Sequence, residues 1–436
     1  MNRRLLTAAG CLLLAVPLAA QPLTLRDAAR EALTRNPRVA AAESDVAAAR
    51  ARHDAARSSW LPLIDAAANA TRSNNPVFVF GSLLEQGRFG QRHFDPQFLN
   101  DPPALTNTRL SVDVRYALFD PVRRFDASPQ DVTRSQSAAE EMRQQLLADV
   151  IARFYGLTVA EQRRAVAAEA VRAAEAAAKA TRDKAEQGLV VDSDRLAAEV
   201  QLAQFRQEAI AAEGDASIAR AALAVTLQRP LMSRFEIEAT LPDRTFVPIE
   251  LSAAIEQALK TRGEIAMAGA ARAAAELQLR GARGSLLPRL DAFVSIGASR
   301  GNSDHAIGVV ARIGVFDNTK YARIAEARAG ADAARAIETM TRDKVAMETI
   351  TAWNRANAAR QQLDVVAAAV VQAEAAARIV QDRYDNGLTT ITELLRAQTA
   401  LVGARLSLIS ARHQSITGYA ELLRSIGGLR EIDPFL

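Results

Sequence analysis

Hydrophobic and polar residues alternate over four short segments of the chain. In Leu110–Leu118 every second residue is apolar. Three other segments alternate less regularly: Leu63–Thr71, Leu290–Arg300 and Ile307–Phe316. Phe293 and Val310 are out of step with their neighbours. Period two predicts strands with one apolar and one polar face. Each segment has about ten residues, the length with which a tilted strand crosses a bilayer.

Elsewhere the apolar positions recur every three or four residues, which predicts helices. Long helices are predicted at 130–187 and 319–386, ended by Gly188 and Gly387 as helix C-termini commonly are. Each is followed by a returning helix. Along the last one a coiled-coil stripe with some polar members is predicted: Ile391, Leu394, Gln398, Leu401, Arg405, Leu408, Ile416, Tyr419, Leu423 and Ile426.

Shorter helix pairs are predicted at 25–60 and 250–286, each ending at a Leu-Pro. A helix of about 60 residues spans roughly 90 Å, which is longer than a compact domain of this size is wide. Two shorter helices placed end to end would match one long helix: 37–60 with 192–228, and 263–286 with 389–427. The lengths therefore predict the wall of a tube, with strands at one end and glycine turns at the other.

The chain contains an internal duplication. Residues 25–65 match residues 251–291 without a gap, 226 positions later, whereas Gln187-Gly188-Leu189 matches Asn386-Gly387-Leu388 only 199 positions later. The first half therefore carries an insertion, which we place at 81–106, where Gly, Pro, Asn and Phe predict a long loop. Phe89, Phe94 and Phe98 could pack there as a plug or cap; a disordered loop is the alternative.

The predicted domains follow from this duplication. They are a signal peptide at 1–20, a first repeat at 21–248, a second repeat at 249–428 and a tail at 429–436. The first repeat holds a strand pair at 62–118 and a helical hairpin at 130–228. The second holds a strand pair at 288–316 and a hairpin at 319–427.

The N-terminus has the pattern of a secretory signal peptide. Arg3 and Arg4 precede the apolar run Leu5–Leu18, and Ala19-Ala20 offers a cleavage site. A membrane anchor is the alternative, as is a lipoprotein signal at Cys11. After cleavage the mature chain would hold no cysteine, and therefore no disulfide or thiol nucleophile.

Composition narrows the class of protein. Hydrophobic residues make up 49% of the 436 residues, but aromatic residues only 5%, and the net charge of +4 is too small to indicate nucleic-acid binding. Beyond the signal no stretch is long and apolar enough for a transmembrane helix. Four strands cannot close a barrel in lipid, so eight, twelve or sixteen strands would need two, three or four copies.

Catalytic and ligand-binding patterns are absent from the sequence. The four histidines, His53, His93, His305 and His413, are scattered, and no metal, paired-cysteine or phosphate-loop motif occurs. We therefore predict no enzyme activity, no cofactor and no metal. The arginines along the helices are expected to be solvated or to form ion pairs between helices.

The segment 383–398, RYDNGLTTITELLRAQ, resembles the second periplasmic turn of the TolC-type outer-membrane efflux protein family. The Ser-Leu-Leu-Pro before the strands, the Leu-Phe-Asp after them and the twofold repeat are also similar to that family. The resemblance implies an α+β fold: a trimeric α-helical coiled-coil tunnel with a 12-stranded transmembrane β-barrel, four strands per chain. It implies an exit duct of the outer membrane reaching into the periplasm, with a periplasmic adaptor and an inner-membrane pump as partners.

The resemblance also implies a gate at the periplasmic tip, beside the turns at Gly188 and Gly387. Glu393 matches an acidic ring position, Tyr384 a tyrosine of the closing network, and Asp194 the acidic partner of that tyrosine. Two positions depart from the family: Arg396 replaces a second acidic residue, and Thr389 replaces an arginine of the network. We therefore expect a narrow, closed entrance that is less cation-selective than a doubly acidic ring. Asp192 is expected only to cap its helix.

Two other classes of protein remain open. A periplasmic coiled-coil adaptor or scaffold would lack membrane strands, and the strand alternation and duplication argue against it. An exported enzyme is disfavoured by the missing site. The substrate, whether drug, metal ion or polypeptide, and the particular pump are not specified by the sequence.

Overall fold

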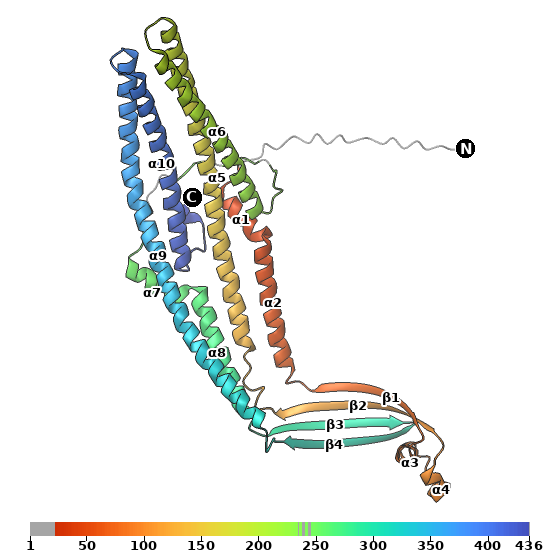
Figure 1. Cartoon of the computed structure of the whole chain (residues 1–436). Coiled ribbons are helices and arrows are strands. Elements are labelled where there is room, and N and C mark those ends of the chain that lie inside the picture. The colour runs from red at the N-terminus through yellow and green to blue at the C-terminus, as the bar shows by residue number, and fades with distance from the viewer. Residues whose placement is uncertain (1–21, 234, 238–239, 243–245, 436) are drawn as a thin grey trace, which may run out of the picture. The chain divides into compact units, whose positions relative to one another are not determined.

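The computed structural model describes residues 22–233, 235–237, 240–242 and 246–435 (Figure 1). The predicted signal peptide lies outside the described residues. The chain forms two compact units: Met1–Pro37 with Arg143–Ala254 and Ile350–Leu436, and Arg38–Met142 with Ile255–Thr349. Each unit combines segments from both predicted repeats, so the compact units and the repeats divide the chain differently. The repeat boundaries stay predictions.

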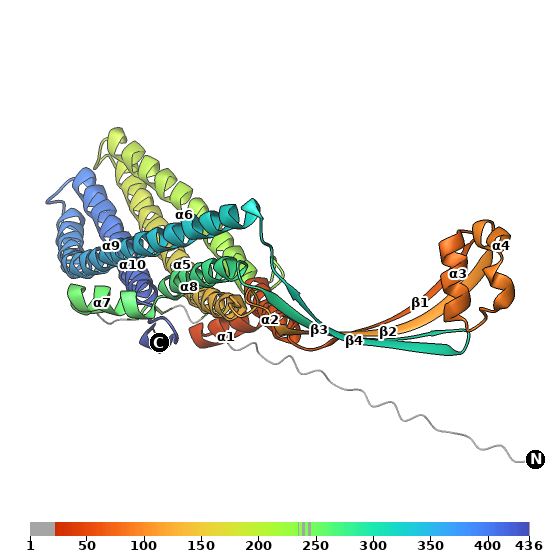
Figure 2. The same ribbon diagram turned by 90° about the horizontal axis from the view of Figure 1, so that it is seen from below.

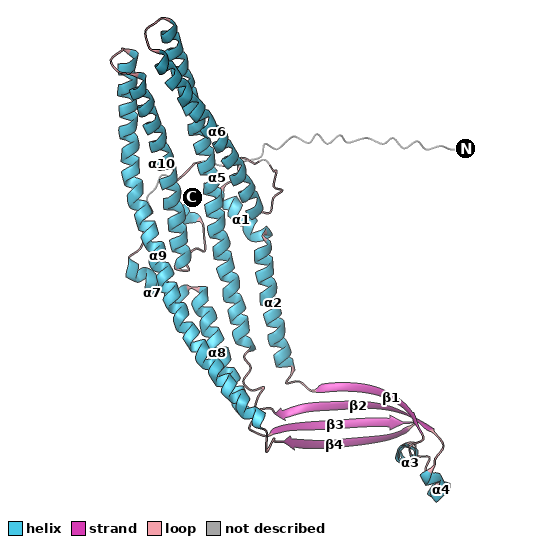
Figure 3. Ribbon diagram, viewed as in Figure 1, coloured by secondary structure: helices cyan, strands magenta, loops and turns pink. Residues whose placement is uncertain are grey.

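Two helical hairpins dominate the fold, as Figure 3 shows. The first joins α5 (Ser128–Glu186) to α6 (Asp192–Thr226), and the second joins α9 (Asn318–Asp385) to α10 (Ile391–Ser425). The prediction of two very long helices is confirmed, since α5 has 59 residues and α9 has 68. Alanine, which has the highest helix propensity, recurs along both helices and favours this length.

The shorter helices form two equivalent pairs, as predicted. They are α1 (Leu25–Arg35) with α2 (Pro37–Ser58), and α7 (Leu251–Thr261) with α8 (Gly263–Gly284). The junctions between the helices of each pair differ. Asn36 donates its side-chain amide to the Thr226 carbonyl at 3.1 Å. At the equivalent position the buried Arg262 pairs with Glu264 at 2.8 Å and with Glu348 at 3.0 Å. A 3₁₀ turn, η2 (Asp433–Phe435), ends the described chain.

The four predicted strands form one antiparallel sheet in the order β1-β2-β3-β4. They are β1 (Leu63–Ser73), β2 (Leu105–Phe119), β3 (Arg289–Ser299) and β4 (Asn302–Arg312). Directly paired residues share a face of the sheet. The register places one set on the first face: Asp65, Asn69, Asn107, Arg109, Asp113, Arg115, Asp291, Ser295 and Asp304. The opposite face carries Ile64, Leu110, Val112, Val114, Tyr116, Ile296, Ile307 and Val309. The sheet therefore has one polar face and one largely apolar face, on which Arg72, Thr108 and His305 lie toward the end of the β3–β4 turn.

The two residues that break the alternation lie on the polar face. Phe293 pairs with Arg115 and Gly308, and Val310 pairs with Asp291. A Cβ atom at Gly308 would stand 2.7 Å from the Phe293 ring, so a residue without a side chain makes room for that ring. The break at Phe293 thus reflects an aromatic side chain lying across the neighbouring strand.

The insertion between β1 and β2 is folded, which corrects the expectation of an irregular loop. It contains α3 (Pro76–Glu85), η1 (Gln91–Phe94) and α4 (Pro96–Asn100). Asn75 and Asp95 cap α3 and α4, and a proline begins each helix. Figures 1 and 2 both show α3 and α4 at the end of the sheet to which β1 leads. None of the helices formed by the described residues carries an apolar stretch that could cross a membrane.

Candidate functional site

Both hairpins turn through the same backbone motif. Gly188 and Gly387 have φ angles of +70° and +71°, a left-handed conformation that glycine adopts without steric cost. In the first turn the amide of Leu189 donates to the Lys184 carbonyl at 2.9 Å. In the second, the amide of Leu388 donates to the Arg383 carbonyl at 2.8 Å. These are Schellman caps, and they confirm that the two predicted glycines end their helices.

A buried apolar cluster supports the second turn. It contains Tyr384, Ile391, Leu394 and Leu395, with Ala197 of the first hairpin packed against it. Tyr384 is only 6% exposed. Its hydroxyl lies 3.3 Å from Thr181 Oγ1, and Lys184 Nζ stands 4.2 Å from the centroid of its ring. Tyr384 therefore connects the end of α9 to α5.

The predicted gate charges of the second turn lie together on the surface. Arg396 Nη1 is 3.2 Å from Glu393 Oε1, and the two side chains are 74% and 54% exposed. Thr390 caps α10 by accepting a bond from the Glu393 amide at 3.4 Å, so Glu393 is not itself the cap. A carboxylate and a guanidinium of this pair thus neutralise each other close to the turn.

The first turn is surrounded by ion pairs. Arg195 bonds Asp192 at 2.7 Å and Glu199 at 3.0 Å, and Arg182 bonds Glu199 at 3.0 Å. The hydrogen bond from Arg195 lowers the pKa of Asp192, and the hydrogen bond from Arg182 lowers the pKa of Glu199. The N-cap of α6 is Val191, so Asp192 follows the cap and pairs with Arg195; the expectation that it caps the helix is wrong.

Asp194 stands in the first turn of α6, where its backbone amide donates to the Val191 carbonyl at 3.0 Å. The hydroxyl of Tyr384 lies within hydrogen-bond distance of Thr181. A link between Tyr384 and Asp194 stays a prediction. Sequence reasoning missed Thr181 and Lys184. The sequence did contain one indication of these contacts. Thr181 and Lys184 lie in the last two turns of α5, as Tyr384 lies in the last turn of α9.

An open groove of about 720 Å³ lies between α6 and α10 beside these turns. Apolar and polar side chains of both helices line it: Ser193, Leu196, Ala197, Val200, Gln201, Gln204, Thr392, Leu395, Arg396, Thr399 and Ala400. Leu189 and Leu388 are also exposed, at 68% and 67%. The hairpin ends therefore present apolar surface to solvent.

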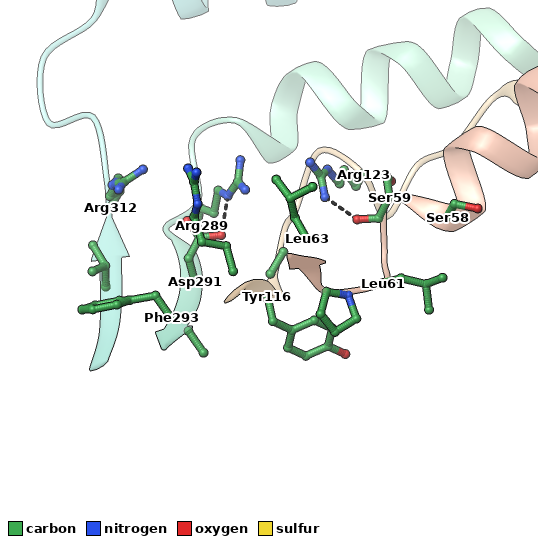
Figure 4. Close-up of a pocket in the computed structure, with 15 residues that line it drawn as sticks. Ser58, Ser59, Leu61, Leu63, Tyr116, Arg123, Arg289, Asp291, Phe293 and Arg312 are labelled. Atoms are coloured by element: carbon green, nitrogen blue, oxygen red, sulfur yellow. Dashed lines mark hydrogen bonds and ion pairs between the residues drawn. The ribbon is translucent and has the colours of Figure 1, made fainter. Parts of the chain in front are cut away.

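A second pocket, of about 510 Å³, lies where the helices meet the sheet. Figure 4 shows the head groups of Arg312, Arg289 and Arg123 along one rim, with the Phe293 and Tyr116 rings farther from that rim. Arg123 donates to the Ser59 carbonyl at 2.6 Å, and Arg289 bonds Asp291 at 2.9 Å. The Arg123 bond joins the segment between β2 and α5 to the segment between α2 and β1, and the Arg289 bond lies within β3, so both have a structural role. Across the described ranges, no group of three or more His, Cys, Asp or Glu side chains is placed to hold a metal ion.

Solved structures of outer-membrane proteins share the fold. The Campylobacter jejuni CmeC outer membrane channel is 17% identical, with a TM-score of 0.80 over 93% of this chain and 85% of that one. The Neisseria gonorrhoeae MtrE outer membrane channel, in its open state, is 20% identical, with a TM-score of 0.77 over 93% and 89%. The outer membrane protein VceC from Vibrio cholerae is 19% identical, with a TM-score of 0.77 over 93% and 96%.

Sequence comparison gives the family directly. No curated protein sequence matches the chain significantly. The sequence model of the outer membrane efflux protein family, however, matches residues 28–227 and 254–428, which include both hairpins and all four strands. The two matched segments also follow the duplication found in the sequence. The chain therefore belongs to the outer membrane efflux protein family.

Proposed function

We propose that this protein is the outer-membrane exit duct of a tripartite efflux or type I secretion system. The observation that supports it most directly is the sheet. One face is polar and one largely apolar, and among the described residues β1 and β4 each pair with one strand and so leave one edge open. In lipid such edges must be paired. Three copies would join β4 of one to β1 of the next and close twelve strands, with the polar faces inward.

The helices favour the same assembly. The exposed apolar residues of α6 gather on one side of that helix: Leu196, Val200, Ile210, Ile218 and Val225. In its hairpin-end half, α9 likewise exposes Val365, Val371 and Ile379. Exposed stripes of this kind mark surfaces that a partner covers. Contact between such stripes of neighbouring copies would continue the twelve strands into a tunnel of helices.

The entrance of this duct would lie at the hairpin turns. Tyr384 and its cluster hold the second turn against α5, and we assign them, together with Asp194, to the closed state. Glu393 and Arg396 would ring the axis near the opening. The groove between α6 and α10, with Leu189 and Leu388, offers apolar surface to a periplasmic adaptor, which would open the entrance for an inner-membrane pump. The duct itself is a passive conduit.

The first test is assembly. The mature protein should fractionate with the outer membrane, and its native mass should be that of a homotrimer. A soluble monomer without membrane association would favour the second candidate, a periplasmic coiled-coil scaffold without membrane strands. The apolar face of the sheet speaks against that candidate, because a scaffold in water would leave it uncovered.

The second test is conductance in a planar bilayer. Glu393→Ala should lower the preference for cations about twofold to threefold, because it removes three carboxylates and leaves three Arg396 guanidinium groups without that partner in a confined pore. Tyr384→Phe should raise conductance by loosening the closed state. Glu421→Ala is the matched control, an acidic residue at the other end of α10 that pairs with Arg424. If Glu393→Ala and Glu421→Ala behave alike, the charges near the second turn do not line the entrance.

A further inference from the structure

The helix α3 of the insertion is apolar on two sides. Val79 and Leu83 are buried, at 2% and 4% exposure, on the part of the insertion where α3 lies against α4 and β2. On another side Val77, Phe80 and Leu84 are exposed, at 80%, 37% and 49%. Phe94 of η1 is also 65% exposed. A helix that is apolar all round is normally covered on all sides, so the side carrying Val77, Phe80 and Leu84 indicates a contact that one copy of the chain does not supply.

The insertion behaves as a folded body. The Phe89 ring contacts Phe80 and Phe94 edge-on, with centroids 4.8 and 5.1 Å away. His93 lies 5.4 Å from Phe89 and 5.0 Å from Phe98 in the same cluster. Aromatic rings packed in this way fix the relative positions of α3, η1 and α4. The exposed apolar side of α3 therefore has a defined direction, set by how the insertion is held to the sheet.

That attachment is to the polar face. Asn107 donates to Glu85 at 2.7 Å and accepts a bond from Gln86 at 3.0 Å. The side-chain amide of Asn302 donates to the Glu85 carbonyl at 3.0 Å. Arg109 and Asp304, which form a two-bond pair at 2.6 and 2.7 Å, lie beside this network. Asn107, Arg109, Asn302 and Asp304 all belong to the polar face in the strand register.

We propose that the insertion is an exit lid, and that the exposed side of α3 meets the equivalent surfaces of the other copies over the outer mouth of the duct. This proposal rests on the proposed function, in which the polar faces line the lumen. A body attached to the lumenal face is kept away from lipid, so lipid cannot cover Val77, Phe80 and Leu84. Identical apolar surfaces of the other copies can do so, and their association would close the exit.

The first experiment is cross-linking between copies. The chain has one cysteine, Cys11, within the predicted signal peptide, so a new cysteine would be alone in the mature protein. Leu84→Cys should form disulfide-linked dimers on mild oxidation of the trimer in the membrane. Ser303→Cys is the control, because Ser303 is exposed at the same end of the sheet but on the apolar face. Equal cross-linking of the two variants, or none at Leu84→Cys in a native trimer, would overturn the lid.

The second experiment measures access to the lumen from outside intact cells. Ser295 lies on the polar face, and Ser295→Cys should resist a membrane-impermeant maleimide as long as the lids meet. Adding Phe80→Ser and Leu84→Ser should raise its labelling about tenfold, because thiol modification depends on access. Gln97→Cys, exposed on the insertion itself, should be labelled equally in both backgrounds.

The outcomes separate the lid from the duct. Strong labelling of Ser295→Cys with the lid intact, in a protein that is trimeric and conducts ions, would overturn the lid and leave the duct standing. A protein that forms neither trimers nor pores would overturn the duct itself. Native mass measurement of each variant distinguishes an opened lid from a failure to assemble.

Discussion

The ends of the two hairpins have the same backbone turn but opposite surroundings. Positions 199 apart are equivalent in the duplication, so Asp192 corresponds to Ile391, Arg195 to Leu394 and Ala185 to Tyr384. In the first hairpin Asp192 and Arg195 form ion pairs in which Arg195 and its second partner Glu199 are half-buried, and Ala185 carries no charge. In the second hairpin the equivalent residues form a buried apolar cluster that also reaches α5. The same turn geometry therefore occurs in a hairpin end stabilised by ion pairs and in one stabilised by apolar packing.

The difference separates what the fold requires from what the proposed gate requires. The glycine turn is common to both hairpins, since any sharp helix reversal of this type needs a left-handed residue. The cluster around Tyr384 is particular to the second hairpin. Exposed ion pairs contribute little and are screened by salt, whereas apolar burial is not. We therefore expect the first hairpin end to open more easily than the second.

The largest effect is expected from Tyr384→Ala. Removing a buried aromatic side chain costs about 3 to 5 kcal/mol, and the loss should fall on the second hairpin end. Hydrogen exchange of segment 380–398 should then become as fast as that of segment 181–199, or faster. Val365→Ala, an exposed position on the same helix, should change exchange little. If Tyr384→Ala speeds hydrogen exchange equally at both hairpin ends, the two ends open as one cooperative unit and are not stabilised separately.

A smaller and equal effect is expected from Gly188→Ala and Gly387→Ala. Each glycine has a positive φ angle that costs an L-residue roughly 1 to 2 kcal/mol. Because the two turns have the same geometry, the free energy of local opening should fall by similar amounts at both hairpin ends. Alanine at Gly330, a helical glycine of α9 with open space around its Cβ position, is the control. A clear inequality between the two turns would mean that the surroundings, and not the φ angle, set the cost.

The sequence predicted the long helices, the four strands and the two turns because each has a strong local signal. Alternation with period two, runs of alanine and a glycine at the helix C-terminus each depend only on residues that are close together in the sequence. The helices of the insertion were missed because its Gly and Pro content was interpreted as a loop. Asn75-Pro76 and Asp95-Pro96 are nevertheless helix-start signals.

The contacts of Tyr384 could not be predicted in the same way. Its partner Thr181 is 203 positions away, and their meeting depends on how two long hairpins align along their lengths. A shift of one helical turn would give Tyr384 a different neighbour. The resemblance to a family indicated a role for Tyr384, but only the structure supplied Thr181 and Lys184 as its neighbours in the chain.

The opposite ends of the hairpins offer a comparison with a smaller effect. Gln228 and Gly427 are equivalent positions, and both have left-handed φ angles, +57° and +65°. The following amides, of Arg229 and Gly428, each donate at 2.8 Å to a carbonyl five residues back. Gln228→Gly should therefore stabilise the C-terminus of α6 by about 0.5 kcal/mol, since glycine adopts this conformation without strain.

The reverse change provides the control for that prediction. Gly427→Ala should destabilise the end of α10, and both variants can be compared by thermal unfolding of the purified protein. The side-chain amide of Gln228 also donates to the Val225 carbonyl at 3.1 Å, and the loss of this bond reduces the gain. A destabilised Gln228→Gly variant would show that this bond outweighs the backbone strain.

The smallest effect is expected from acid, and it should distinguish the two hairpin ends. Asp192 and Glu199 have pKa values lowered by their bonds to Arg195 and Arg182, so their stabilising contribution is present at neutral pH and is lost as pH falls through these lowered values. The change should therefore appear only below the ordinary pKa values of free Asp and Glu, 3.8 and 4.5.

Hydrogen exchange of segment 181–199, corrected for the intrinsic effect of pH, should then rise severalfold at acid pH. The buried residues of the cluster around Tyr384 carry no carboxylate, and the exposed Glu393–Arg396 pair is not one of them, so the second hairpin end should keep its protection. About 1 M salt at neutral pH should act in the same direction, because it screens exposed pairs. If acid and salt loosen both ends alike, the ion pairs are not what holds the first hairpin end closed.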